Sequence, residues 1–171
     1  MRLKSRWQKI LVSSGLIAVM LAALGGAVLA YLGSEAHIIE AQTETPRIVL
    51  ANQAFDVTLT LHNTSDSPQE LISIGVERDL LHQGLNVVEM VPPYREGDTT
   101  GQSRWAEFTF AIQRRPTLQP DEALRMRIAM VATQPGTYSG DLAIWAKNQA
   151  QADYAPLTVV VVEHPAPWLG R

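Results

Sequence analysis

The sequence predicts an all-β fold, an antiparallel β-sandwich of about seven or eight strands that follows one transmembrane helix. Three observations lead to this prediction: an uncharged apolar run near the N-terminus, an alternation of apolar and polar residues from about residue 46 onward, and clusters of turn residues between the alternating runs. Alternation with a period of two residues is typical of strands that bury one face. Short strands separated by regular turns are typical of a sandwich.

The apolar run covers residues 10–32 and holds 23 positions without a charged residue. A helix of that length extends about 34 Å, enough to cross a hydrocarbon core of about 30 Å. Four basic residues precede the run and an acidic stretch follows it, so the positive-inside rule places the N-terminus in the cytoplasm. The alternative is a signal peptide cleaved after Ala30, but the apolar part of a signal peptide spans only about 7–15 residues.

We therefore expect a single-pass protein of the cell membrane whose C-terminal domain is extracytoplasmic. The expected parts are a basic cytoplasmic N-terminus (1–9), a transmembrane signal-anchor helix (10–32), a linker (33–44), the β-sandwich (45–164) and a C-terminal tail (165–171).

Composition narrows the possible functions. Four of the 14 basic residues precede residue 33, which leaves 10 against all 17 acidic residues and a formal balance of −7 for the rest of the chain. Nucleic-acid binding needs a clustered basic surface, so no nucleic-acid partner is expected. The chain has no cysteine, which removes disulfides, thiol nucleophiles and thiolate metal sites. A chain of this length can bury an adequate core without disulfides.

Each alternating run has one apolar face, and we expect eight strands and no helix after the anchor. The apolar sets are Phe55, Val57, Leu59 and Leu61; Ile72, Ile74 and Val76; Ala106, Phe108, Phe110 and Ile112; Leu124, Met126, Ile128 and Met130; and Tyr138, Leu142 and Ile144.

Two neighbour relationships are expected among these strands. Segments 104–112 and 122–131 are expected to pair as antiparallel neighbours, with Glu107 opposite Arg127. The strand that ends at Trp145 is expected to lie between segments 70–77 and 156–163, which would bring small residues close to Trp145. The last strand is apolar on both faces, so one set of its valines must point outward.

Two stretches resemble bacterial immunoglobulin-like domains of the CARDB and NEW3 kind. "AFDVTLTLHNTSDSPQEL" is similar to their B–C hairpin, and "QPGTYSGDL" is similar to their E–F corner and F strand. The resemblance covers roughly residues 45–163 and implies an immunoglobulin-like sandwich. It implies that Pro135, Gly136 and Tyr138 form a structural corner capped by the tyrosine hydroxyl. One departure from the family pattern is that Asn52 or nearby residues replace the usual turn glycine before the B strand. Such domains usually act as spacers, adhesion modules or docking units, and few are enzymes.

The candidate binding residues are aromatic. Trp145 and Ala143 are expected on the outer face of their sheet, and an outward tryptophan beside outward valines suggests a covered surface. The cover is another protein subunit, the C-terminal tail with Trp168, or the membrane surface. Trp105 is also expected to point outward, on the other sheet. A protein partner and the tail are equally expected as the cover, and the candidate partner-binding residues are Trp145, Ala143, Trp168 and Trp105.

No residue pattern indicates catalysis or a bound cofactor. Ser139 lacks the strand-to-helix elbow of a nucleophilic serine, and the histidines match no zinc spacing. We therefore expect a non-enzymatic interaction module, an accessory subunit of a surface or envelope assembly. One alternative is a copper carrier that uses His82 or His164 with Met90 or Met130. The other alternative is a passive spacer.

Overall fold

The computed structural model describes Met20 and residues 38–163. The chain divides into two compact units, Met1–Ala36 and His37–Arg171, and all described residues except Met20 belong to the second. Among the described residues, no helix is long and apolar enough to span a membrane. Apart from Met20, the expected anchor 10–32 lies outside the described residues, as do the N-terminal segment 1–9 and Trp168.

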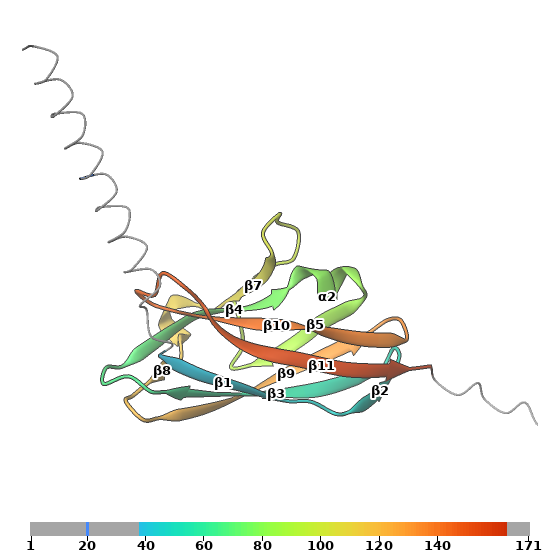
Figure 1. The fold of residues 1–171 in the computed structure, drawn as a ribbon, viewed down its shortest axis with the longest axis horizontal. Helices are drawn as coiled ribbons and strands as arrows, with labels where there is room; N and C mark the ends of the chain where they lie inside the picture. Colours follow the sequence, from blue (N-terminus) through green and yellow to red (C-terminus); the bar gives the residue numbers. More distant parts are fainter. Residues whose placement is uncertain (1–19, 21–37, 164–171) are drawn as a thin grey trace, which may run out of the picture. The chain divides into compact units, whose positions relative to one another are not determined.

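Strands dominate the described part of the domain (Figure 1). The elements are β1 (Ile39–Glu44), β2 (Ile48–Leu50), β3 (Ala54–Asn63), β4 (Gln69–Glu77), α2 (Arg78–His82), β5 (Leu85–Val91), β6 (Glu96–Asp98), β7 (Trp105–Thr109), the 3-10 turn η1 (Ile112–Arg114), β8 (Thr117–Leu118), β9 (Ala123–Ala132), β10 (Gly136–Ala146) and β11 (Asp153–Val162).

These strands form two sheets. Sheet A has the order β1-β3-β9-β5, and sheet B has the order β2-β11-β10-β4-β7-β6, with β8 paired to β4. The chain enters through β1 in sheet A and crosses at once to β2, which runs parallel to β11 in sheet B. It later leaves sheet B for β5 and returns to add the β6–β7 hairpin beside β4. The expected all-β sandwich is thus confirmed for the described residues.

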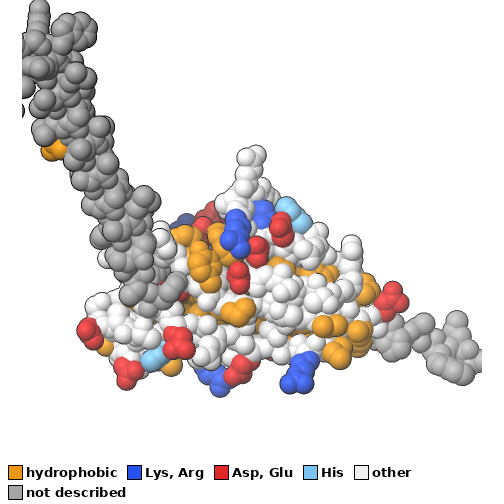
Figure 2. Space-filling model, in the orientation of Figure 1, with side chains coloured by type: hydrophobic (Ala, Val, Ile, Leu, Met, Phe, Trp, Pro, Cys, Tyr) orange, Lys and Arg blue, Asp and Glu red, His pale blue; other side chains and the backbone are white. Residues whose placement is uncertain are grey.

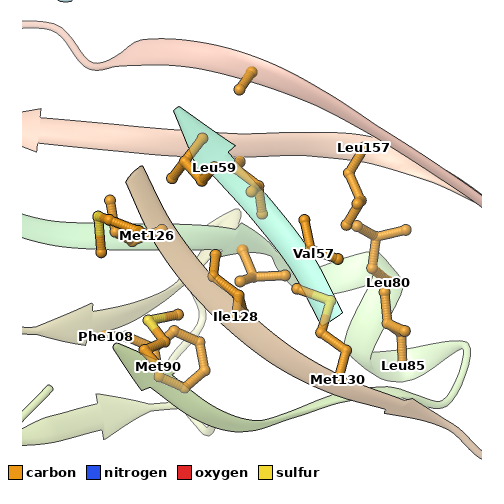
Figure 3. Close-up of a cluster of buried hydrophobic side chains, with 14 of the residues drawn as sticks. Val57, Leu59, Leu80, Leu85, Met90, Phe108, Met126, Ile128, Met130 and Leu157 are labelled. Carbon is orange, nitrogen blue, oxygen red and sulfur yellow. The ribbon is translucent and has the colours of Figure 1, made fainter. Parts of the chain in front are cut away.

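The core lies between the sheets and is built mostly from the predicted apolar faces, but Ile112, which was expected to share the face of Phe108 and Phe110, is 66% exposed on the turn η1. Val57 and Leu59 of β3 point toward side chains of the opposite sheet, such as Leu157 of β11 (Figure 3). Met90 lies beside Phe108 in the same view, and all these side chains are buried. Alternation places every second residue of β11 inside, which leaves Val160 and Val162 as the outward valines.

The predicted pairing of 104–112 with 122–131 is wrong. Strand β7 pairs with β4, whereas β9 lies in the other sheet between β3 and β5. The apolar faces of both strands do reach one common core, but from opposite sheets. Glu107 therefore lies opposite Gly75, and Arg127 instead forms ion pairs with Asp56 and Glu89.

Two further expectations need correction. The segment 33–44 was expected to be a linker, but β1 occupies its second half and completes sheet A. No helix was expected after the anchor, but α2 forms one short turn between β4 and β5. Leu80 of α2 is buried in the core, so this turn closes the sandwich on one side.

The corner before β10 has the hydrogen bond that the resemblance implies. The Tyr138 hydroxyl lies 2.8 Å from the carbonyl oxygen of Gln134 and 3.1 Å from that of Gln83, and it has one proton to donate between them. Gly136, which follows Pro135, has a φ of 154°. Asn52 has a φ of 61°, the left-handed conformation that otherwise favours glycine.

Candidate functional site

Trp145 lies on the outer face of sheet B, on a strand flanked as predicted. Strand β10 pairs with β11 on one side and with β4 on the other, and Trp145 lies opposite Ser73. Its ring is half-buried, and its indole N–H is buried without a hydrogen-bond acceptor among the described residues. Neighbouring side chains therefore already cover part of the tryptophan.

Trp105 belongs to the group of side chains against which Trp145 packs, and its predicted place was wrong. It lies on β7 in the same sheet as Trp145, and only 9% of it is exposed. Its indole occupies the space above Gly75, where an added Cβ would lie 3.5 Å from Trp105 Cε3. Trp105, Trp145, Ala143 and Ala152 pack together as a small cluster on the outside of the sheet.

Tyr154 extends this cluster to β11. Trp105 and Tyr154 belong to strands three positions apart, about 14 Å at roughly 4.8 Å per strand. Their ring centroids nevertheless lie 5.6 Å apart, because the intervening row contains only Gly75 and Ala143. We call Trp105, Trp145, Tyr154, Ala143 and Ala152 the aromatic cluster. Tyr154 is its most accessible member, with 46% of its surface exposed.

An ion network borders the aromatic cluster. The Arg104 guanidinium lies 4.8 Å from the centre of the Trp105 ring, within the range of a cation–π contact. The same group forms ion pairs with Glu77 at 3.1 Å and with Asp141 at 3.7 Å. One guanidinium and two carboxylates leave a formal charge of −1 at this edge of the cluster.

An uncharged row continues from the cluster along β11. Its outward residues, which we call the β11 stripe, are Tyr154, Pro156, Thr158, Val160 and Val162, and all are exposed. Ile48 of the neighbouring strand β2 lies opposite Val160 and is 65% exposed. Figure 2 shows hydrophobic side chains gathered toward both ends of β11.

The outer face of sheet A has the opposite character. Arg125 pairs with Glu44 at 3.1 Å, and Arg127 lies between Asp56 and Glu89. Hydrogen bonds from Arg127 to Glu89 and then Asp56 raise the pKa of this guanidinium. Charged side chains line the side of β1 and β3 in Figure 2. The outer face of sheet A is therefore charged around β1, β3 and β9, whereas sheet B carries an uncharged row along β11 beside its own ion pairs.

Buried Arg78 is a structural group that the sequence reasoning missed. Its guanidinium donates hydrogen bonds to the carbonyl oxygens of Thr99, Ser103 and Trp105, which fixes the loop before β7. In the same loop, the N–H groups of Gly101 and Thr100 donate to Asp98 and hold the pKa of its carboxyl below the usual range. Arginines are usually exposed, so burial of Arg78 was not expected. The length of the polar loop before β7 was the only sequence feature that indicated a need for an internal anchor.

A polar cleft of about 450 Å³ opens where β4 begins and β10 ends, and Glu70 and Lys147 are among its lining residues. Arg115 and Lys147 donate hydrogen bonds to Glu70 at 2.9 and 3.1 Å, and these bonds lower the pKa of the Glu70 carboxyl. A carboxylate held ionised by two cations is a weak base. Glu70 is therefore poorly suited to general acid–base chemistry.

The residues of the copper alternative are used differently. Met90 and Met130 are 1% and 0% exposed and fill the hydrophobic core (Figure 3), whereas His82 is exposed at the end of α2. His164 lies outside the described residues. Within 38–163, no group of three or more His, Asp or Glu side chains is placed to hold a metal ion.

The strand order decides the fold type. Strands β1-β3-β9-β5 match the A-B-E-D sheet of an immunoglobulin domain, and β11-β10-β4 match its G-F-C sheet. The domain is an immunoglobulin-like β-sandwich. Its main departure is the β6–β7 hairpin, which extends the second sheet beyond β4.

Solved structures show a similar course of the chain, although no protein-family model and no curated protein matches the sequence. A CARDB domain from Pyrococcus furiosus, crystallised in complex with di-metal ions, is 15% identical over 72% of this chain and 87% of its own, with a TM-score of 0.40. The solution structure of that domain is 14% identical over 73% and 94%, with a TM-score of 0.42. The cupredoxin domain of amoB from Nitrosocaldus yellowstonii is 11% identical over 79% and 96%, with a TM-score of 0.45.

Proposed function

We propose that this chain is a membrane-anchored, extracytoplasmic interaction module without enzymatic activity, an accessory subunit of a surface or envelope assembly. The apolar run 10–32 supplies the anchor in this proposal, and the basic residues before it set the orientation. The immunoglobulin-like domain then stands outside the membrane and docks a protein partner through the outer face of sheet B.

The contrast between the two outer faces carries this proposal. Sheet A covers its outer face with ion pairs, which a solvated surface tolerates at little cost. Sheet B has ion pairs around Arg104, but along β11 and β2 it exposes Tyr154, Val160, Val162 and Ile48. Half-buried Trp145 lies near the Tyr154 end of this row. Exposed apolar side chains that gather on one face favour a contact surface, because burying them removes apolar area from water.

The proposal is tested by placing one charge on each face of the full-length chain. Tyr154→Glu alters sheet B at an exposed position, and Thr60→Glu is the matched change in the middle of a strand of sheet A. Partners are captured from the native membrane with wild type and both variants, and folding is checked by circular dichroism. We expect Tyr154→Glu to reduce recovery of a co-purifying protein at least fivefold, while Thr60→Glu leaves it unchanged.

Equal recovery with both folded variants would contradict docking through sheet B. A chain that recovers no protein in any form would instead act as a passive spacer.

A further inference from the structure

More negative than positive charge borders the aromatic cluster. Glu77 ends β4 beside Asp141, whose N–H donates to the Glu77 carboxylate at 3.2 Å. Glu107 lies opposite Gly75, at the β7 edge of the cluster. Arg104 pairs with both Glu77 and Asp141. Three carboxylates and one guanidinium give a formal balance of −2 around the aromatic rings.

The basic residues at the other end of this face are separate from that border. Arg115 and Lys147 both pair with Glu70, at 2.9 and 3.1 Å. Glu70 lies near the start of β4, whereas Glu77 is its last residue. The acidic border is therefore the side of the cluster near Asp141, and a positive group of a partner is attracted to that side.

Asp141 and Tyr154 are diagonal neighbours across β10 and β11. Asp141 lies opposite Pro156, whereas Tyr154 lies opposite Ala143. Diagonal neighbours on one face of a sheet are about 7–8 Å apart, so one long side chain can contact both. The Asp141 side chain is 40% exposed, and its ion pair with Arg104 is long, at 3.7 Å. A carboxylate has two acceptor oxygens, so Asp141 has the capacity to accept from a further donor.

The same face already holds one cation on an aromatic ring. The Arg104 guanidinium lies 4.8 Å from the centre of the Trp105 ring and pairs with Glu77 at 3.1 Å. Tyr154 and Asp141 offer a second ring beside a second carboxylate, and Tyr154 is 46% exposed. The quadrupole of an aromatic ring attracts a cation, and a neighbouring carboxylate adds a charge-assisted hydrogen bond. This pair of residues is therefore suited to a guanidinium or ammonium group.

Net charge favours the same kind of partner. The chain after residue 32 has a formal balance of −7. Such a domain attracts a basic surface over a distance and repels an acidic one, which includes a second copy of itself.

We infer that the partner protein docks on the aromatic cluster with a basic segment, in which an arginine or lysine side chain lies on the Tyr154 ring and pairs with Asp141. Apolar residues of the same segment then contact the β11 stripe, which begins at Tyr154 and has no charged member. The inference rests on the proposed function and names the chemistry of its partner.

A neutral amide at position 141 tests the predicted ion pair. Asp141→Asn keeps the shape of the side chain and removes its charge, while Arg104 retains Glu77. Asp56→Asn is the matched control on sheet A, because Asp56 likewise shares its arginine with a second carboxylate. Partners are captured from the native membrane with full-length wild type and both variants, and folding is checked by circular dichroism. We expect recovery of the co-purifying protein to fall about threefold with Asp141→Asn and to stay unchanged with Asp56→Asn.

The sign of the charge at position 154 gives a second test. Tyr154→Glu and Tyr154→Lys both remove the ring, but the lysine also repels a basic side chain. We expect recovery with Tyr154→Lys to be about threefold below that with Tyr154→Glu. Recovery by wild type should also fall as salt rises from about 0.1 M to about 1 M, because the Debye length shortens from about 10 Å to about 3 Å.

Three results would overturn the inference. They are an equal effect of Asp141→Asn and Asp56→Asn, a recovery with Tyr154→Lys that matches or exceeds that with Tyr154→Glu, and a wild-type recovery that does not fall with salt. Capture of a second copy of the chain as the co-purifying protein would overturn it as well.

The two proposals can fail separately. If Tyr154→Glu reduces recovery while Asp141→Asn does not, the basic segment is refuted and the docking face stands. If none of these variants changes recovery, both proposals are refuted.

Discussion

The indole of Trp105 lies in the space that a side chain at position 75 would fill. A Cβ added to Gly75 would lie 3.3 Å from Trp105 Cβ and 3.2 Å from Ala143 Cβ. This absence of a side chain lets the ring reach across β4 and β10 to Tyr154 on β11. One glycine therefore sets the shape of the apolar face of sheet B.

A larger side chain at position 75 should displace the Trp105 ring further. Gly75→Ala requires the neighbouring Cβ atoms of Ala143 and Trp105 to move by a few tenths of an ångström, whereas Gly75→Val adds two further methyl groups beneath the ring. Overpacking of this kind costs about 1–3 kcal/mol, so we expect the valine variant to be the less stable. Acrylamide quenching of tryptophan fluorescence should increase for valine more than for alanine. Unchanged quenching in a folded valine variant would contradict the packing described here.

Replacing Asn63 should destabilise the domain strongly. Its fully buried amide donates to the carbonyl oxygens of Ser67, Leu118 and Gln119, and its own oxygen accepts from Ser65. Asn63→Ala leaves these buried groups without a partner, and we expect a loss of about 2–4 kcal/mol in the free energy of unfolding by urea.

Exposed Asn86, which makes one bond to Gly84, is the matched control and should change stability by less than about 0.5 kcal/mol. Equal losses of stability from the alanine substitutions of Asn63 and Asn86 would contradict the structural role of the buried Asn63 amide. Asn63, Thr64 and Ser65 also match the acceptor sequence for N-glycosylation, but the burial of Asn63 closes it to that modification in the folded domain.

The loop before β7 should loosen when Arg78 is changed. A lysine keeps the charge but cannot direct hydrogen bonds at three separate carbonyl oxygens as the planar guanidinium does. We expect Arg78→Lys to lower stability by about 2 kcal/mol and to speed cleavage between residues 99 and 104 by a non-specific protease. Arg95→Lys, at an exposed position, should leave the cleavage pattern unchanged. If the Arg78→Lys variant were first cleaved outside residues 99–104, the role of Arg78 in holding this loop would be contradicted.

Acid should weaken the domain partly through Glu70. The pKa of its carboxyl is held below the ordinary value of 4.5 by hydrogen bonds from Arg115 and Lys147. A lowered pKa in the folded state means that the stabilisation is present above 4.5 and is lost as pH falls through the lowered value. Glu70→Gln should therefore be less stable than wild type at pH 7, and the difference should shrink at low pH. Urea unfolding of both proteins at a series of pH values measures this difference in stability. A stability difference that does not change with pH would contradict the pairing of Glu70 with Arg115 and Lys147.

Alternation alone was enough to find most of the core. The apolar faces of 55–61, 126–130 and 142–144 are buried, because a strand with a period of two residues has only one way to bury such a pattern. Alternation predicts the wrong buried residue where a strand breaks its period of two. A register shift between Trp145 and Ala146 places Leu71 opposite Ala146, so Leu71 is fully buried and Ile72 only partly.

Strand partnership was harder to predict than strand location. The apolar faces of β7 and β9 fit each other equally well across the core or side by side, and an apparent charge match between Glu107 and Arg127 favoured the wrong choice. Trp145 lies on an outer face as predicted, but the position of the Trp105 ring over sheet B depends on Gly75, which lies on the neighbouring strand β4. Such a contact between distant segments leaves no trace in a local pattern.

A hydrogen bond joins the two ends of the domain. The N–H of Ile39 donates to the carboxylate of Asp153 at 3.1 Å, a bond between residues 114 positions apart. Strand β1 is already paired with β3 along all six of its residues, so this bond adds a link from the first strand to β11 in the other sheet. Contacts so distant in the chain slow the search for the native state. During synthesis the link can form only once residue 153 has emerged, so the joining of the two ends is a late step.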